Sequence, residues 1–311
     1  MPNLRKILHS MATHPRYTLM RAVARFGTAR RLVEQGRRLA HANKSAAFLE
    51  ECEARMPQSL FQQVDRGRLV LDLERDGVAF GLKLPKESVD EILRFTQAVP
   101  VYADRDVRRG YRHEEHSEAQ VRLGKPILLA QYFNAAAECA AIEQLANDSA
   151  LHWIACKYLG SVPKLVGVNM WWTYPVDASA EDRDLHAHLF HRDVDDFRFF
   201  KFFFYLTDVP AGEGAHICVV HSHQRPPVLR TGDRWNIRRY SDAEIASAYS
   251  DEHIVEICGE AGTGFAENTL CVHKGRTPTT QPRLLLQIQF ALFDYGFMHD
   301  LRSGHELKAL A

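Results

Sequence analysis

The chain has 311 residues, of which 46% are hydrophobic and 25% are charged, and such a chain can bury a sizeable core as one large or two small domains. Its six cysteines form no CxxC pair, which argues against a zinc knuckle and a disulfide scaffold and favours a reducing compartment. No apolar stretch resembles a secretory leader or approaches the ~18 residues of a spanning helix, so we expect a cytoplasmic protein.

Charge is distributed unevenly along the chain. Residues 1–50 carry ten Lys or Arg against two Glu, a net charge of +8, which leaves a net charge of −8 on the rest. Residues 15–42 place apolar side chains at helical intervals between arginines, which predicts one or two basic amphipathic helices. These basic helices could pack on the acidic remainder of the protein, which is the alternative that we favour, or they could contact an anionic membrane surface. We expect no nucleic-acid partner. We therefore divide the chain into a basic helical arm, residues 1–60, and a second domain, residues 61–311.

The middle of the chain is a mixture of predicted helix and loop. Residues 69–99 predict a short helix, a turn, a strand and a further helix. Residues 103–125 are polar without a period, which predicts a surface loop that could lie over a site. Residues 135–160 predict helices that end at a glycine. The N-terminal half is therefore expected to be largely helical.

From residue 164 onward the sequence consists of short β-branched and aromatic runs bounded by Gly, Pro, Asp and Asn. These runs occupy residues 164–176, 197–209, 215–223, 253–259, 269–275 and 283–296. Strands at this spacing indicate a sandwich or barrel. The predicted fold class is mainly β with α: a double-stranded β-helix (jelly roll, cupin-like) with a helical N-terminal half.

A candidate metal site begins with His191 and Asp193. On a strand, residues i and i+2 point to the same face, so the imidazole and the carboxylate would converge. They would supply two ligands of the 2-His-1-carboxylate triad that binds Fe(II) and leaves positions open. His273, at the end of a later strand, is the candidate third ligand, because strands distant in sequence face one another in a jelly roll.

Arg283 opens the strand that follows His273 after a polar turn. A guanidinium beside a metal offers a planar fork for a carboxylate. Arg276, within the turn, is the competing residue, and we favour Arg283 because it opens a strand with an inward face. Gln287 shares that face and would look into the same cavity, and Asn169, on another strand, could also line it.

Several other histidines and carboxylates lie near these residues in sequence. His186 and His188 are predicted at the edge of the site, and His216 is predicted to satisfy a turn or the backbone. Asp195 and Asp196 are predicted as turn residues whose charge could support the metal ligands. None of these five replaces the triad in our interpretation.

Residues 190–224 and 262–292 together resemble the phytanoyl-CoA dioxygenase family of iron- and 2-oxoglutarate-dependent oxygenases. The shared features are an HxD, a YLTDV-like segment, a Ser-His after the next turn, a distal His and a trailing Arg, in this order. The resemblance covers residues 69–297 and is strongest over residues 164–297. One departure is the His-Ser-His at residues 221–223, where the family often has Gly-Ser-His.

The resemblance implies that His191, Asp193 and His273 are the catalytic Fe(II) ligands and that Arg283 pairs with the distal carboxylate of 2-oxoglutarate. It implies hydroxylation of an unactivated C–H of a small-molecule or lipid-like substrate by O₂, with release of succinate and CO₂. The retained Asp193 separates the chain from related halogenating enzymes. The alternatives are a non-catalytic metal-binding jelly roll and a metal oxygenase or isomerase that needs no 2-oxoglutarate. The sequence predicts neither the substrate nor the oligomeric state.

Overall fold

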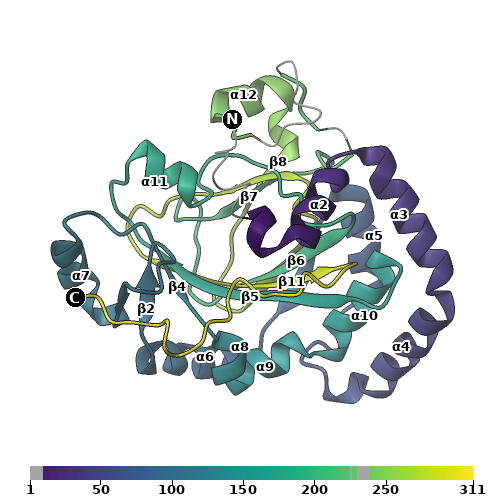
Figure 1. Ribbon diagram of the computed structural model, residues 1–311, viewed down its shortest axis with the longest axis horizontal. Coiled ribbons are helices and arrows are strands. Elements are labelled where there is room, and N and C mark those ends of the chain that lie inside the picture. Colours follow the sequence, from purple (N-terminus) through teal and green to yellow (C-terminus); the bar gives the residue numbers. More distant parts are fainter. Residues whose placement is uncertain (1–9, 225, 230–237) are drawn as a thin grey trace.

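The structure is a computed structural model that describes residues 10–224, 226–229 and 238–311, and its strands form two antiparallel sheets (Figure 1). The larger sheet contains β1 (Val78–Lys83), β2 (Val101–Ala103), β3 (Gly110–Tyr111), β4 (Leu129–Tyr132), β5 (Lys164–Thr173), β6 (Phe199–Tyr205), β9 (Thr263–Glu267) and β11 (Arg283–Ala291). The smaller sheet contains β7 (His216–Val219), β8 (Ile254–Ile257) and β10 (Val272–Gly275). The strand orders are β1-β9-β6-β11-β5-β4-β2-β3 and β10-β7-β8.

The two sheets face each other across an apolar layer. Phe203 and Tyr205 from β6 pack in one buried cluster with Cys218 from β7 and Ile257 from β8. Such packing of two antiparallel sheets, with strands distant in sequence brought face to face, is the jelly-roll arrangement. The predicted fold class is therefore confirmed.

Helices cover the outer face of the larger sheet, where α6, α8, α9 and α10 lie along it in Figure 1. The α-helices are α2 (Pro15–Ala24), α3 (Gly27–Ala40), α4 (Ala42–Ala54), α5 (Arg66–Asp76), α6 (Lys86–Ala98), α7 (His116–Leu123), α8 (Ala135–Glu138), α9 (Ala140–Ala146), α10 (Ser149–Leu159), α11 (Ala180–Leu185) and α12 (Asp242–Ala248). Short 3-10 helices are η1 (Met56–Gln58), η2 (His113–Glu115) and η3 (Asp251–His253). Among the described residues, no helix is long and apolar enough to cross a membrane.

Strand β6 shows why the phenylalanine run does not alternate with polar residues. Phe200, Phe202 and Phe204 belong to the core beneath the helices. Lys201 and Phe203 point the other way, into the space between the sheets. Every residue of β6 is buried because both of its faces are covered, as the sequence predicts.

The predicted sequence of helix, turn, strand and helix over residues 69–99 is confirmed by α5, β1 and α6. The turn between α5 and β1 needs glycine for two reasons. Gly77 has a φ of +82° and ends α5 in the left-handed conformation. A Cβ at Gly77 would also lie 2.3 Å from the Sγ of Cys271, so a side chain there would displace the segment that precedes His273.

The prediction of a loop over residues 103–125 is wrong in part. The structure places β3, η2 and α7 in this segment. Helix α7 buries only Ala119, so its sequence shows no helical period. Its first residue, His116, stacks on Tyr174 with 3.6 Å between ring centroids, a tertiary contact that sequence periodicity does not reveal.

The basic arm contacts the body of the protein. The Nε of Arg21 on α2 donates to the carbonyl of Val194 at 2.9 Å, and an Nη of Arg37 on α3 donates to the carbonyl of Leu292 at 2.9 Å. Arg198 of the body pairs with Glu34 of α3 at 3.3 Å. These contacts agree with the packing alternative that we favour, whereas the division at residue 60 stays a prediction.

Replacing Phe202 with alanine tests the assignment of β6 to the core. Phe202 is completely buried, so Phe202→Ala should lower the free energy of unfolding by about 3–5 kcal/mol. Urea denaturation followed by circular dichroism measures this change. The matched control is Phe80→Ala on β1, where the side chain is 50% exposed and the loss should stay below about 1 kcal/mol. Equal losses in the two variants would contradict the assignment.

Candidate active site

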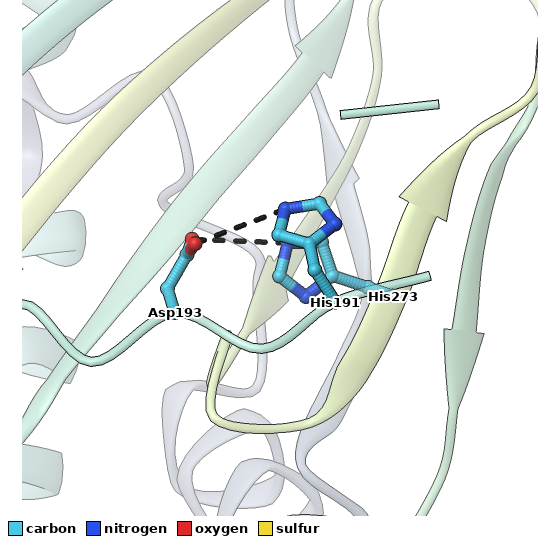
Figure 2. Close-up of side chains that lie close together, drawn as sticks. All are labelled: His191, Asp193 and His273. Atoms are coloured by element: carbon cyan, nitrogen blue, oxygen red, sulfur yellow. Dashed lines mark ion pairs between the residues drawn. The ribbon is translucent and has the colours of Figure 1, made fainter. Parts of the chain in front are cut away.

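Two histidines and one aspartate converge between the sheets (Figure 2). His191 and His273 form an isolated antiparallel bridge, in which each backbone N–H donates to the other residue's carbonyl at 2.9 Å. The Nε2 atoms of His191 and His273 lie 3.8 and 3.7 Å from the carboxylate oxygens of Asp193. One ligand atom from each of the three residues lies within 4.8 Å of the others. The structure thus brings together the three residues of the predicted triad.

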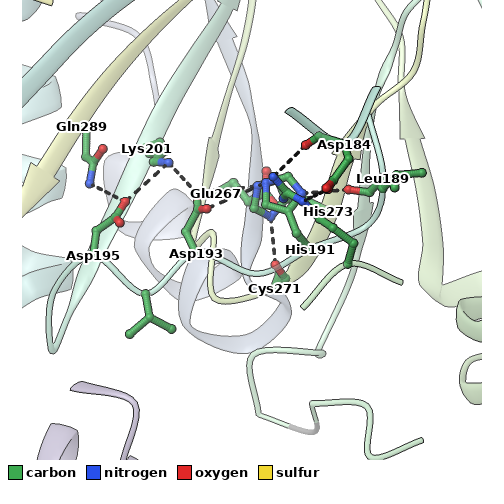
Figure 3. Close-up of polar contacts among 12 residues, drawn as sticks. Asp184, Leu189, His191, Asp193, Asp195, Lys201, Glu267, Cys271, His273 and Gln289 are labelled. Atoms are coloured by element: carbon green, nitrogen blue, oxygen red, sulfur yellow. Dashed lines mark hydrogen bonds and ion pairs between the residues drawn. The ribbon is translucent and has the colours of Figure 1, made fainter. Parts of the chain in front are cut away.

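Both imidazoles are oriented by the backbone. The Nδ1 of His191 lies 2.9 Å from the carbonyl of Leu189, and the Nδ1 of His273 lies 2.9 Å from the carbonyl of Cys271 (Figure 3). A carbonyl oxygen can only accept, so each Nδ1 carries the hydrogen and each Nε2 keeps its lone pair. Such a backbone partner is what fixes the tautomer of a metal-binding histidine. Two Nε2 atoms and a carboxylate oxygen form a donor set that fits a divalent transition metal.

A buried lysine holds the carboxylate of Asp193. The Nζ of Lys201 lies 2.6 Å from one oxygen of Asp193 and 3.9 Å from Asp195, which also accepts from Gln289 at 3.3 Å (Figure 3). Burial alone would raise the pKa of Asp193, but Lys201 and then the two histidines outweigh it, so the pKa lies well below its usual range. Asp193 is therefore ionised and oriented before any metal binds.

Sequence reasoning missed Lys201, although a signal for it exists. A lysine inside a run of phenylalanines on a strand buried on both faces must find a charged partner. Reasoning from that residue would have pointed back to the carboxylates at Asp193 and Asp195. Asp195, predicted as a turn residue, lines the pocket, whereas Asp196 is buried and accepts from the backbone N–H of Phe293 at 2.8 Å.

A second acid lies behind His273. Glu267, at the end of β9, is completely buried, and one of its oxygens lies 2.5 Å from the Nε2 of His216. The ring of His216 stacks on His273 with 5.5 Å between centroids. Burial raises the pKa of Glu267 to about 7, although the nearby His273 opposes this. His216 thus supports the site instead of satisfying a turn, and β9, which brings Glu267 there, was not among the predicted strands.

These residues line a pocket between the sheets of about 400 Å³, a usual volume for a small-molecule site. We call it the active-site pocket, and its walls include Asn169, Asp193, His188, Arg283, Gln287 and Gln289. Gln287 and Asn169 face each other in the register of β11 and β5. The predicted edge residues His186 and His188 also line it.

Arg283 and Arg276 differ in their surroundings. Arg283 is 3% exposed, and its guanidinium donates to the Thr173 hydroxyl at 2.9 Å and to the Gly214 carbonyl. Its buried Nε has no hydrogen-bond partner among the described residues. Arg276 instead pairs with Glu256 at 2.9 Å on the surface. Only Arg283 faces the active-site pocket.

A second group of possible metal ligands, Asp104, Asp182 and His186, is an ion-pair network. Lys125 lies 3.0 Å from Asp104 and 3.4 Å from Asp182, and Arg109 lies 2.6 Å from Asp104. These two cations neutralise both carboxylates. The network stabilises the edge of the pocket, and neither carboxylate keeps an uncompensated negative charge that would attract a metal ion.

Comparison with known proteins assigns the chain to a family. The phytanoyl-CoA dioxygenase (PhyH) family model matches residues 73–284. No curated protein matches the chain significantly. Among solved structures, the epimerase SnoN in complex with Fe³⁺, alpha ketoglutarate and nogalamycin RO is 18% identical, with a TM-score of 0.50 over 72% of this chain and 82% of its own.

HygX from Streptomyces hygroscopicus, with nickel, 2-oxoglutarate and hygromycin B bound, is 16% identical, with a TM-score of 0.50 over 79% of this chain and 95% of its own. At such identities these two proteins establish a shared fold. The family match extends over most of the chain and includes the HxD, the distal histidine and Arg283. The chain therefore belongs to the phytanoyl-CoA dioxygenase family of iron- and 2-oxoglutarate-dependent oxygenases.

Proposed function

We propose that this protein is an Fe(II)- and 2-oxoglutarate-dependent oxygenase that hydroxylates a C–H bond of a small-molecule or lipid-like substrate. The observation that carries the proposal is the convergence of His191, Asp193 and His273 in the pocket that Arg283 also enters. A facial set of two imidazoles and one carboxylate leaves coordination positions for a chelating co-substrate and for O₂. Family membership supports the same chemistry.

The metal would be held by the Nε2 of His191, the Nε2 of His273 and a carboxylate oxygen of Asp193. When bound, Fe(II) supplies the activation of O₂ that accompanies conversion of 2-oxoglutarate to succinate and CO₂. The protein's part is to keep the ligands oriented. The backbone carbonyls hold both imidazoles, and Lys201 holds one oxygen of Asp193.

Arg283 would bind the distal carboxylate of 2-oxoglutarate. It is a buried cation, it has no carboxylate partner among the described residues, and its Nε lacks a hydrogen bond. A buried, unpaired guanidinium is costly unless an anion joins it. Gln287 and Asn169, on neighbouring strands, would contact the body of the co-substrate, and Phe203 and Leu285 form an apolar part of the pocket wall.

Titration with Fe(II) and 2-oxoglutarate tests the proposal. Under anaerobic conditions the pair should produce a visible charge-transfer absorption band, and admission of air should release succinate. Asp193→Ala should bind Fe(II) at least about tenfold more weakly, because it loses the anionic ligand. Asp177→Ala, which removes a fully exposed carboxylate, is the control and should bind as the wild type does.

Each alternative gives a different outcome in that titration. A non-catalytic binding protein would bind the metal without releasing succinate, and an enzyme independent of 2-oxoglutarate would show no band with it. Unchanged Fe(II) affinity in Asp193→Ala would refute the ligand assignment. Mass analysis of the product separates hydroxylation, which adds an oxygen atom, from an epimerisation, the class of reaction for which the epimerase SnoN is named.

Arg283→Gln should weaken binding of 2-oxoglutarate by about 30-fold or more while leaving Fe(II) affinity unchanged. Loss of one member of a buried charged pair costs about 2–5 kcal/mol, which corresponds to this range. Calorimetry with Ni(II) in place of Fe(II) measures both affinities without turnover. Arg276→Gln, in the preceding turn, is the matched control. Weaker 2-oxoglutarate binding in Arg276→Gln alone would transfer the role to Arg276.

Peripheral contact of the arm with an anionic membrane is a separate proposal. Leu32 and Leu39 are exposed on α3, two turns apart and beside Arg31 and Arg38, which suits a membrane surface. The protein should co-sediment with phosphatidylserine vesicles, and the Leu32→Ser/Leu39→Ser variant should not. The control is Leu71→Ser, which removes an exposed leucine on α5. Equal sedimentation of all three proteins would end this proposal.

A further inference from the structure

The active-site pocket carries more positive charge than metal and co-substrate binding require. Its lining includes four cationic side chains and two carboxylates, contributed by Arg105, Lys201, Arg283, Arg302, Asp193 and Asp195. If Fe(II) and 2-oxoglutarate bind as proposed above, their charges of two plus and two minus cancel. An excess of two positive charges then remains, and a pocket of one sign attracts an anion.

Three of the four cations already have polar partners. Lys201 pairs with Asp193, and Arg283 donates to Thr173 and Gly214. Arg302 donates to the carbonyl of Leu301 at 2.5 Å. The fourth, Arg105, has no hydrogen bond and no ion pair with any described residue. Its guanidinium lies over the face of the Trp171 ring, with 5.8 Å between the guanidinium carbon and the ring centroid.

Arg105 stands in a backbone conformation that its side chain disfavours. Asp104 and Arg105 follow β2 with φ angles of +55° and +61°. Aspartate tolerates this left-handed region, but it is uncommon for arginine, and strained residues of this kind cluster at functional sites. Two consecutive residues in this conformation form a tight turn that directs Arg105 toward the pocket.

The surrounding chain holds the turn in place. The backbone N–H of Asp104 donates to the carbonyl of Leu129 on β4 at 2.9 Å, and that of Asp106 donates to Ala103 at 2.9 Å. The Asp104 carboxylate lies in the ion-pair network with Arg109 and Lys125. These contacts fix the base of the turn and leave the Arg105 side chain exposed at the pocket.

We propose that Arg105 is the residue that recognises the substrate, and that the substrate is an organic anion whose acid group, a carboxylate or a phosphate, pairs with this guanidinium. The inference rests on the proposed function where it treats this pocket as the place of the reaction. The expected negative charge of the ligand follows from the residues that line the pocket and does not depend on that function. Trp171 lies beneath the guanidinium and would contact the apolar part of the substrate next to its acid group.

A test uses three phenyl compounds: 3-phenylpropionate, its neutral amide 3-phenylpropionamide, and phenyl phosphate. Calorimetry measures their binding to the full chain, both metal-free and loaded with Ni(II) and 2-oxoglutarate. An acid should bind at least about tenfold more tightly than the amide, as expected for a charge-assisted hydrogen bond. Whether the carboxylate or the phosphate binds more tightly identifies the acid group.

Arg105→Asn should abolish the preference for the acids. Asparagine tolerates the left-handed conformation, so the variant should keep or raise the Tm of the wild type, and the loss cannot be attributed to unfolding. Arg108→Asn is the matched control, because Arg108 lies in the same segment and pairs with Asp106 on the surface at 3.0 Å. It should bind the acids as the wild type does.

Three results would overturn the inference: no preference of the wild type for either acid over the amide, unchanged acid binding in Arg105→Asn, or an equal loss of 2-oxoglutarate binding in that variant. The last result would assign Arg105 to the co-substrate. Failure of the Fe(II) and 2-oxoglutarate titration, with Arg105-dependent acid binding retained in metal-free protein, would refute only the proposed function. Success of that titration without acid binding would refute only the role of Arg105.

Discussion

The candidate metal centre depends on the reciprocal pair of backbone hydrogen bonds between His191 and His273. Residues 190 and 191 are not part of a regular strand, and this bridge is what ties the HxD segment to β10. It brings two side chains separated by more than eighty positions to one point, and the carbonyls of Leu189 and Cys271 then orient both rings. Asp193 is held independently, through its N–H to Thr269 and its carboxylate to Lys201. The three donors are thus preorganised by the protein itself.

Because side chains alternate along a strand, one face of the larger sheet packs in the core and the other lines the active-site pocket. On β11, Leu284, Leu286 and Ile288 pack in the core under the helices, while Arg283 and Gln287 enter the pocket. The three apolar side chains in the core resist displacement because close-packed cores tolerate little change in volume. That rigidity is transmitted to the polar residues between them, which is how an apolar strand can hold a charged site in a fixed geometry.

The sequence was sufficient for the HxD, the distal histidine and the arginine because each lies next to a recognisable strand. It was insufficient for Glu267 and Arg105. Glu267 reaches the site through β9, a short strand whose place beside β6 depends on the sheet order. Arg105 reaches it through a turn whose conformation depends on contacts with β4 and with Lys125. The positions of both residues depend on contacts between segments that are distant in sequence, and local propensity and periodicity do not predict such contacts.

Helix α2 contacts the segment that carries Asp193, although α2 lies outside the range matched by the family model. It precedes the family match at residues 73–284, yet its Arg21 donates to the carbonyl of Val194 and lies 3.6 Å from Asp195, directly after the aspartate of the HxD. Tyr17 also donates to Asp195, at 3.4 Å. The segment that carries Asp193 is therefore enclosed from outside by a part of the chain that the shared family pattern does not describe. The range matched by the family model and the set of residues that contact the HxD segment thus do not coincide, because α2 contributes contacts from outside that range.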